Sequence, residues 1–341
     1  MIQARVIKPG SISFCEVKDL SSKDLNPNEI LLRIKKIGIC GGDIHVMHGK
    51  HPFVTYPVIQ GHEYGAEVVS VGTNVTKVKV GDKATARPQL VCEKCTQCRD
   101  GRYNVCQNLR VQGFQAPGAA QPYFIVPEDR IIKVDSSLSF EEIAMIEPCA
   151  VAAHATSKLE LTNKNIVITG AGTIGNLVAQ FSIARGAKNV LITDVSDLRL
   201  KKAQECGIKN VANTAKEDFQ SAIEKVFAGE SFQIGFEVSA AQACVTDLVT
   251  NIQKGGDIVI VAVFAEPVKV NLSELGEHEL SMIGTMMYFH EDFELAAKMI
   301  KDKKITLDPL ITQYFNFVEY PQAFEFIDNH REECMKVIID I

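Results

Sequence analysis

The chain has 341 residues, of which 46% are hydrophobic and 23% are charged. That length is enough for two domains with separate cores, and the composition is that of an ordinary globular protein. The net charge of −6 shows no basic surplus, and no apolar run is long enough to span a bilayer, so we expect neither a nucleic-acid nor a membrane partner.

The N-terminus, MIQARVIKPG, predicts a first strand and not a signal peptide, because it lacks an apolar central segment. We therefore expect a cytoplasmic protein. Ten cysteines would be many for disulfides in that compartment, so clustered cysteines indicate metal ligands.

Residues 1–149 predict mainly β-structure. Residues 30–34 and 66–71 form apolar or alternating runs, and glycines and prolines separate such runs. We expect a barrel-like or partly open β domain with many loops. The last part of the chain, residues 286–341, contains a predicted helix at 291–301 and a strand at 336–339, and we expect it to return to this domain.

Two short motifs in the first domain contain candidate metal ligands. Cys40 lies in GICGGDIH, and His62 and Glu63 lie in GHEYGAE. A thiolate, an imidazole and a carboxylate form a three-ligand zinc set with one open position. An open zinc position can bind an alcohol oxygen and favour the alkoxide from which hydride leaves. Taken singly, Cys40 could equally be a packed core residue and His62 a core histidine.

A third motif, CEKCTQCRDGRYNVC, places four cysteines in one loop, at positions 92, 95, 98 and 106 (Cys92, Cys95, Cys98 and Cys106). The two-residue gaps put successive thiolates on one side of a tight turn, and the fourth can close a tetrahedron around zinc. Four soft thiolates without an open position predict a structural site. Ligand count alone also permits an iron–sulfur cluster.

Residues 150–285 change to strands alternating with helices, which predicts a doubly wound parallel sheet. The strands are expected at 166–168, 190–192, 234–237, 258–261 and 280–284, and the helices at 173–185, 198–206 and 240–252. We expect this α/β region to be the nucleotide-binding domain.

The turn GAGTIG connects the first of these strands to the first helix. Gly170 allows the tight turn, Gly172 leaves room for a pyrophosphate, and Gly175 lets the helix pack close to the sheet. The helix begins with Thr173 and Ile174, whose free N–H groups would face the phosphates.

The second strand ends in Asp194, whose carboxylate can accept hydrogen bonds from the adenosine ribose and would repel a 2′-phosphate. The sequence therefore predicts NAD as the cofactor. Arg199 follows five residues later and is expected to cover the adenine, although an arginine there could instead meet the extra phosphate of NADP.

The order of these motifs resembles the zinc-dependent medium-chain alcohol dehydrogenases along essentially the whole chain. Glu63 directly after His62 and the segment IEPCAVAAHA at 146–155 are most similar to the sorbitol, threonine and sugar-acid dehydrogenases of that superfamily. The resemblance implies a Rossmann NAD domain at 150–285 and a GroES-like catalytic domain at 1–149 and 286–341, with two zinc ions per chain. It also implies a homodimer or homotetramer.

By that resemblance Cys40, His62 and Glu63 hold the catalytic zinc, and Glu147 either joins them or hydrogen-bonds the zinc water. Asp43 would orient His62, and His45 would end a proton relay at the solvent.

The sequence departs from its relatives two residues after Cys40. Relatives usually carry a serine or threonine there, whose hydroxyl takes the substrate proton, whereas this chain has Gly42. The relay would then need a water molecule, Glu147 or a hydroxyl of the substrate.

These observations favour an NAD- and zinc-dependent oxidoreductase acting on a secondary alcohol of a polyol or a sugar acid. One alternative is a threonine-type or simple alcohol dehydrogenase. Another is an NAD-binding regulatory protein that lost turnover together with the relay hydroxyl.

Overall fold

The structure, a computed structural model, describes all residues from 1 to 341 and divides into two compact units. Unit 1 contains Met1–Glu147, Phe289–Lys301 and Ile311–Ile341, and unit 2 contains Pro148–Tyr288 and Asp302–Leu310. No helix combines the length and the apolar character that crossing a membrane requires.

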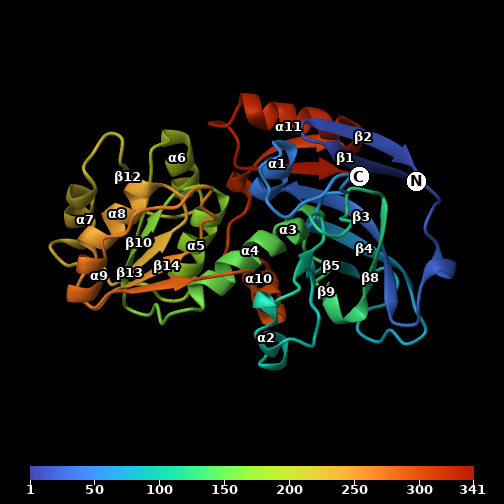
Figure 1. The fold of residues 1–341 in the computed structure, drawn as a ribbon, viewed down its shortest axis with the longest axis horizontal. Coiled ribbons are helices and arrows are strands. Elements are labelled where there is room, and N and C mark those ends of the chain that lie inside the picture. The colour runs from blue at the N-terminus through green and yellow to red at the C-terminus, as the bar shows by residue number, and fades with distance from the viewer. The chain divides into compact units, whose positions relative to one another are not determined.

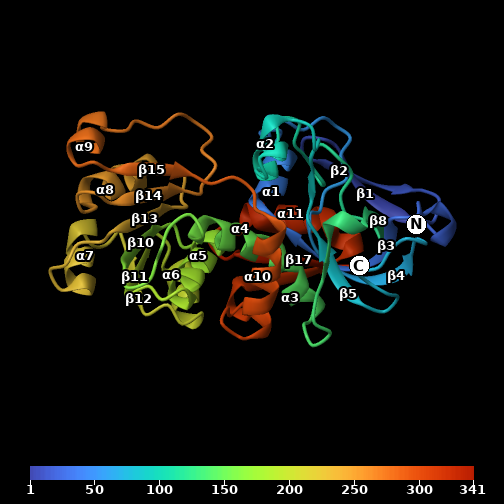
Figure 2. The ribbon, with the colours of Figure 1, turned by 90° about the horizontal axis from the view of Figure 1, so that it is seen from below.

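Unit 1 is built mainly from strands, most of which are labelled in Figures 1 and 2. Its strands are β1 (Ile2–Lys8), β2 (Ser11–Glu16), β3 (Glu29–Ile39), β4 (Glu63–Val71), β5 (Lys83–Ala86), β6 (Gln89–Leu90), β7 (Arg110–Val111), β8 (Tyr123–Pro127), β9 (Ile131–Lys133), β16 (Ile311–Asn316) and β17 (Lys336–Asp340). Its helices are α1 (Gly41–Met47), α2 (Thr96–Arg99), α3 (Phe140–Ala144), α10 (His290–Lys301) and α11 (Tyr320–Asn329), and α4 (Ile146–Thr156) begins in this unit and continues into the next.

A seven-stranded sheet forms the centre of unit 1. Six strands run in the order β16-β17-β3-β4-β5-β9, and β8 pairs with β3. Apolar residues that alternate along β3 and β4, such as Leu32, Ile34 and Val68, enter a core that also receives Phe324 and Ile327 of α11. The C-terminal strand β17 pairs with β3, so the end of the chain completes the domain in which it began.

Unit 2 contains a six-stranded parallel sheet with the order β12-β11-β10-β13-β14-β15. The strands are β10 (Asn165–Thr169), β11 (Asn189–Asp194), β12 (Asn210–Asn213), β13 (Ile234–Glu237), β14 (Asp257–Ile260) and β15 (Ser281–Gly284). The helices are α5 (Thr173–Ala184), α6 (Asp197–Glu205), α7 (Phe219–Phe227), α8 (Gln242–Asn251) and α9 (Leu272–Glu277). Helices lie on both faces of the sheet (Figure 1), which confirms the predicted doubly wound α/β fold.

The order of strands in unit 2 reverses beside β10. Chain-adjacent β11 and β12 lie on one side of β10, whereas β13, β14 and β15 lie on the other. Ligands of such sheets bind at the carboxyl ends of the strands at this switch point. The GAGTIG turn directly follows β10 and therefore lies at the position where the fold class places a nucleotide.

The structure differs from the sequence-based domain limits at residues 148–149 and 286–288, which belong to unit 2, and in one longer segment. Residues 302–310 belong to unit 2, although the sequence suggested that everything after residue 285 returns to the first domain. The physical reason is a pair of hydrogen bonds between the Gln180 side chain of α5 and the backbone of Thr306, at 3.0 and 2.7 Å.

Candidate metal and nucleotide sites

Cys40 lies where strand β3 ends and helix α1 begins. It is the N-cap of the helix, and its N–H donates to Asp43 Oδ2 at 2.9 Å. The Gly42 N–H donates to the Cys40 sulfur at 3.4 Å. Because a capping residue has a fixed backbone, these contacts set the direction of the thiol.

His62 and Glu63 come from the start of β4, the neighbour of β3 in the sheet. Gly61 precedes them with φ +93°, a left-handed conformation that favours glycine. The antiparallel register places Glu63 opposite Gly38, close to the point where β3 reaches Cys40. The candidate ligand atoms of Cys40, His62 and Glu63 consequently lie within 4.8 Å of one another, and both His62, directly before β4, and Glu63, its first residue, are buried.

The Glu63 carboxylate is paired with a buried lysine, Lys336, at the start of β17. The Lys336 ammonium donates to the two carboxylate oxygens at 2.7 and 2.5 Å, and to the Ile39 carbonyl at 3.1 Å. Burial alone would lower the pKa of Lys336, but the negative charge of Glu63 raises it above its ordinary value. Lys336 therefore keeps its positive charge in this buried position beside the Glu63 carboxylate.

Glycine at position 38 makes this pairing possible. Strand β3 lies between β4 and β17, so the Glu63 carboxylate must pass over β3 to reach Lys336. A Cβ on Gly38 would lie 2.1 Å from Glu63 Oε2. Any larger residue would therefore take the place of the carboxylate.

His62 faces a second buried carboxylate, that of Asp43. Their Nδ1 and Oδ1 atoms are 3.9 Å apart, and both atoms are buried without a hydrogen-bond partner. Burial raises the pKa of Asp43. Burial alone would lower the pKa of His62, but Asp43 and Cys40 raise it well above its usual value. At 3.9 Å the two groups interact electrostatically and form no hydrogen bond, because a hydrogen bond needs a closer approach.

The two remaining residues predicted for this site lie farther from its centre. Glu147 is buried in the first turn of α4 and acts electrostatically on His62 and Lys336, but it is outside the group of ligand atoms within 4.8 Å. His45 is an exposed residue of α1.

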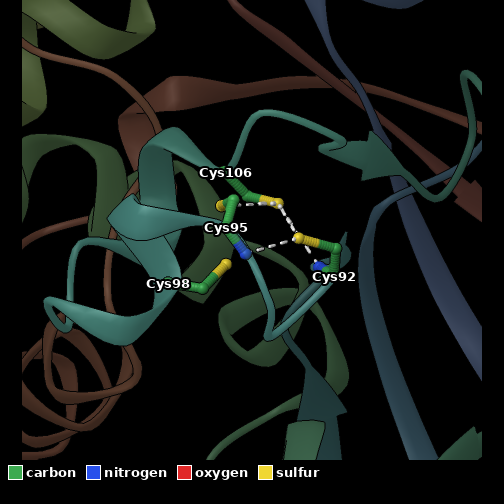
Figure 3. Close-up of side chains that lie close together, drawn as sticks. All are labelled: Cys92, Cys95, Cys98 and Cys106. Carbon is green, nitrogen blue, oxygen red and sulfur yellow. Dashed lines mark hydrogen bonds between the residues drawn. The ribbon is translucent and has the colours of Figure 1, made fainter.

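The four cysteines of the second group lie together in one lobe of unit 1, as Figure 3 shows. The sulfurs of Cys92 and Cys106 are 3.5 Å apart, and those of Cys95 and Cys106 are 4.0 Å apart. Backbone N–H groups also point at the sulfurs, for example from Cys95 to Cys92 at 3.4 Å. Hydrogen bonds from the Lys94 and Cys95 N–H groups lower the pKa of the Cys92 thiol to about 6.

Aromatic and basic side chains attach the cysteine lobe to the rest of unit 1. The Arg87 guanidinium lies 5.0 Å from the centre of the Tyr103 ring, and Tyr103 itself lies between Cys98 and Cys106 in the chain. The Tyr103 hydroxyl accepts a hydrogen bond of 2.7 Å from the N–H of His290 in α10. The lobe is thus joined both to the strand region and to the C-terminal part of the unit.

Both donor sets suit zinc by their chemistry. Four thiolates match a closed tetrahedral site, whereas Cys40, His62 and Glu63 leave one position of a tetrahedron open. Thiolate and imidazole ligands distinguish both groups from sites for calcium or magnesium, which take oxygen ligands.

The three glycines of the GAGTIG turn differ in whether the fold itself requires glycine at their position. Gly170 has φ +97°, and a Cβ on Gly175 would lie 1.8 Å from the Gly170 carbonyl oxygen, so the fold itself needs glycine at both positions. A Cβ on Gly172 would meet no atom within 4 Å, and φ there is −64°. The protein's own packing therefore does not require Gly172, which agrees with close approach of a ligand.

Asp194 ends β11 beside this turn. Its carboxylate accepts hydrogen bonds from the Ala171 N–H at 2.7 Å and from the Ser196 N–H at 2.9 Å. The Arg199 guanidinium lies 3.9 Å from the same carboxylate and is half-buried. Thr173 and Ile174 form the first turn of α5, as the sequence predicted.

Sequence reasoning missed three residues that shape the metal site: Gly38, Lys336 and Phe114. The ring of Phe114 packs on His62 with 4.9 Å between ring centres. A lysine at the head of the apolar run KVIID was the one available signal for Lys336, because a buried lysine needs an acidic partner. Nothing in the sequence alone indicates which residue that partner is.

Comparison with known proteins identifies both units. Residues 26–136 match the family described as "Alcohol dehydrogenase GroES-like domain", and residues 173–302 match that described as "Zinc-binding dehydrogenase". Sorbitol dehydrogenase 1 of Saccharomyces cerevisiae is 30% identical over 92% of this chain and 91% of its own length. An L-threonine 3-dehydrogenase of Rhizobium johnstonii is also 30% identical, over 89% of this chain and 88% of its own.

A solved structure matches the fold over the whole chain. It is an alcohol dehydrogenase from Escherichia coli in complex with NADH, with a TM-score of 0.91 and 26% identity. The match covers 100% of this chain and 99% of the other.

Proposed function

Because the chain belongs to the zinc-dependent medium-chain alcohol dehydrogenases, we propose that it transfers hydride between NAD and a secondary alcohol of a polyol or sugar acid. It is an oxidoreductase whose cofactors are zinc and NAD. The observation that carries the proposal is the meeting of Cys40, His62 and Glu63 in one group with an open ligand position.

In the proposed reaction Cys40, His62 and Glu63 hold the zinc, and Lys336 holds the Glu63 carboxylate in place. Zinc supplies Lewis acidity that favours loss of the alcohol proton. Asp43 would orient the His62 ring from its buried position 3.9 Å away. Glu147 would act from the margin of the site, on water or on substrate.

Proton release is the least conventional part of the proposed reaction. Gly42 offers no hydroxyl, so the proton must pass to water, to Glu147 or to a hydroxyl of the substrate. His45 is exposed and fits the outer end of such a path.

The cysteine lobe fits the other zinc ion, with Cys92, Cys95, Cys98 and Cys106 as ligands. A closed thiolate site provides no position for substrate, so we assign it a structural role. The nucleotide would lie on the GAGTIG turn of unit 2, with Asp194 favouring NAD over NADP through repulsion of a 2′-phosphate.

Two glutamate variants on the same strand test the metal assignment. Glu63→Ala should lose one zinc ion and nearly all NADH formation while NADH still binds, because the nucleotide turn lies in the other unit. Glu67→Ala is the control, since Glu67 is a half-buried residue of β4 outside the ligand group. Equal activity of Glu63→Ala and the control would refute the assignment.

The second candidate is a threonine-type dehydrogenase, which the similarity to the Rhizobium enzyme favours. Initial rates of NADH formation with polyols, hexonates, L-threonine and simple alcohols separate the two, and repeating the series with NADP tests the role of Asp194. NADH binding and full zinc content without turnover of any alcohol would instead support a regulatory NAD-binding protein.

The assembly we propose is a homodimer or homotetramer. Strand β15 is the last strand of its sheet and pairs only with β14, so one edge has unpaired backbone groups. In the chain segments on either side of β15, Val263, Leu272 and Met286 are exposed apolar side chains. Light scattering on a sizing column gives the subunit number. The ten cysteines, none of which is in a disulfide, favour a reducing compartment such as the cytoplasm.

A further inference from the structure

Phe114 packs tightly against the metal-ligand group. Its ring centre lies 4.9 Å from that of His62 and 4.7 Å from that of His51, with planes 46° and 21° apart. The ring therefore contacts both a candidate ligand and a histidine of the loop that follows α1. Phe114 is only half-buried, so part of the ring faces outward.

The same ring occupies the space beside Gly42. A Cβ added to Gly42 would lie 2.8 Å from Cζ of Phe114, well inside van der Waals contact. A serine or threonine at position 42 would extend farther still. The ring cannot turn aside freely because it packs on the imidazoles of both His51 and His62.

Backbone and side-chain bonds hold the Phe114 loop in this place. Gln115 accepts a hydrogen bond from the Val111 N–H at 2.9 Å and donates one to the Phe53 carbonyl at 3.3 Å. Phe53 belongs to the same loop as His51, so the two loops are tied together beside the ligand group.

We propose that Phe114 is a specificity-determining residue of this site, that it excludes a side chain from position 42, and that the substrate itself supplies the missing hydroxyl. The inference rests on the proposed function and narrows its substrate class to alcohols with a hydroxyl on the neighbouring carbon. The flat ring would contact the carbon chain of such a substrate, and its hydroxyls would face the polar side of the site.

The chemistry of oxidation explains why a second hydroxyl matters. Conversion of a carbinol to a carbonyl breaks one C–H and one O–H bond, with the hydride passing to NAD and the proton to an acceptor. With neither Ser nor Thr at position 42, the neighbouring hydroxyl of the substrate can take the proton and pass it to water. Positioned proton transfer of this kind is worth about 10²–10⁴ in rate.

A thermal unfolding cycle tests the steric part without any turnover. Gly42→Ser should lower Tm by roughly 3–8 °C through overpacking, and adding Phe114→Ala should remove most of that loss. Gly41→Ser is the matched control, because a Cβ on Gly41 meets no atom within 4 Å. Its effect should be the same with and without Phe114→Ala. Additive effects of Gly42→Ser and Phe114→Ala on Tm would overturn the exclusion of a side chain by Phe114.

A matched pair of alcohols tests the chemical part. Wild type should prefer butane-2,3-diol over butan-2-ol by about 100-fold or more in kcat/KM, and Phe114→Ala alone should keep much of that preference. In the double variant Gly42→Ser/Phe114→Ala the preference for the diol should be at least about tenfold smaller than in Phe114→Ala. The space left by the ring then holds the serine at position 42, and the serine hydroxyl can take the proton. Equal preference in these two variants would refute the role of the substrate hydroxyl.

Phe326→Ala provides the control for the loss of an aromatic ring. Phe326 is also a half-buried phenylalanine stacked on a histidine, His330, with 4.4 Å between ring centres, but it lies on α11. It should leave the preference unchanged. If wild type binds NADH and zinc but oxidises none of the alcohols tested, both the proposed function and the role of the substrate hydroxyl are refuted. The unfolding cycle still tests whether Phe114 excludes a side chain from position 42.

Discussion

The two candidate zinc sites of unit 1 are built in opposite ways. The cysteine lobe takes its four ligands from fifteen consecutive residues, 92–106, and most of its sulfurs are partly exposed. The other group joins Cys40 to His62 and Glu63 across two strands, and Glu63 reaches Lys336, 273 positions farther along the chain. A local loop defines the first site, whereas the register of a sheet defines the second.

This difference determines what each site depends on. The cysteine loop needs no distant part of the chain to form its metal site. Its own backbone N–H groups already point at the sulfurs. The Glu63 site depends on the fold, because a buried carboxylate needs both Lys336 and the space over Gly38. Damage to the first site should therefore stay within its loop, whereas damage to the second should also lower the unfolding free energy of unit 1.

The largest effect is expected from Lys336→Met. It leaves the buried Glu63 carboxylate without its cation, and breaking a buried pair in this way costs about 3–5 kcal/mol of unfolding free energy. Urea unfolding measures the loss for the metal-free protein. Lys133→Met serves as the control, because Lys133 pairs with Asp82 at 2.7 Å but is half exposed, and its loss should cost no more than about 1 kcal/mol. Similar losses of unfolding free energy in both variants would show that the buried Glu63–Lys336 pair contributes no more to stability than the partly exposed pair of Lys133.

A smaller and more local effect is expected from Cys98→Ser. Replacing one thiolate should release the structural zinc and lower Tm, while the Cys40 site keeps its metal. Zinc analysis and a thermal scan, with and without a chelator, measure both effects. Loss of both zinc ions from this variant would show that the two sites are not independent.

The smallest effect on the fold is expected from Gly172→Ala in the nucleotide turn. The added methyl group meets no protein atom within 4 Å, so Tm should stay within about 2 °C of wild type. NADH affinity should nevertheless fall about tenfold or more, because the methyl group occupies the approach of the pyrophosphate. Fluorescence titration with NADH gives the affinity. Gly175→Ala is the contrasting variant, since its methyl group would lie 1.8 Å from the Gly170 oxygen and should destabilise unit 2. Unchanged NADH affinity in Gly172→Ala would place the nucleotide elsewhere.

Local patterns in the sequence were enough to predict most of the fold. The expected strand at 166–168 is β10 and the expected helix at 173–185 is α5, with limits that differ by one residue at most. Strand β12 and helix α7 were not predicted, although Phe219, Ile223 and Phe227 have the spacing of a buried helical face. The attachment of residues 302–310 to unit 2 depends on Gln180, a contact between distant parts of the chain that no local pattern records.

The sequence likewise predicted one part of the candidate site, its metal ligands, but not the residues around them. The ligands Cys40, His62 and Glu63 lie in motifs with recognisable chemistry, and the structure brings them together. Lys336, Gly38 and Phe114 lie in ordinary strand and loop sequences, and their contribution follows from register and packing. Sequence motifs thus indicated which groups could hold a metal ion, whereas the residues that position these groups required the structure.

Zinc content per chain tests most directly the claim of two independent sites, one local and one assembled by the fold. We would measure it by elemental analysis in wild type, Cys98→Ser, Glu63→Ala and the variant with both changes. We expect two zinc ions in wild type, one in each single variant and none in the double variant, with NADH still bound by Glu63→Ala. A single zinc ion in wild type, or two in Glu63→Ala, would contradict this claim.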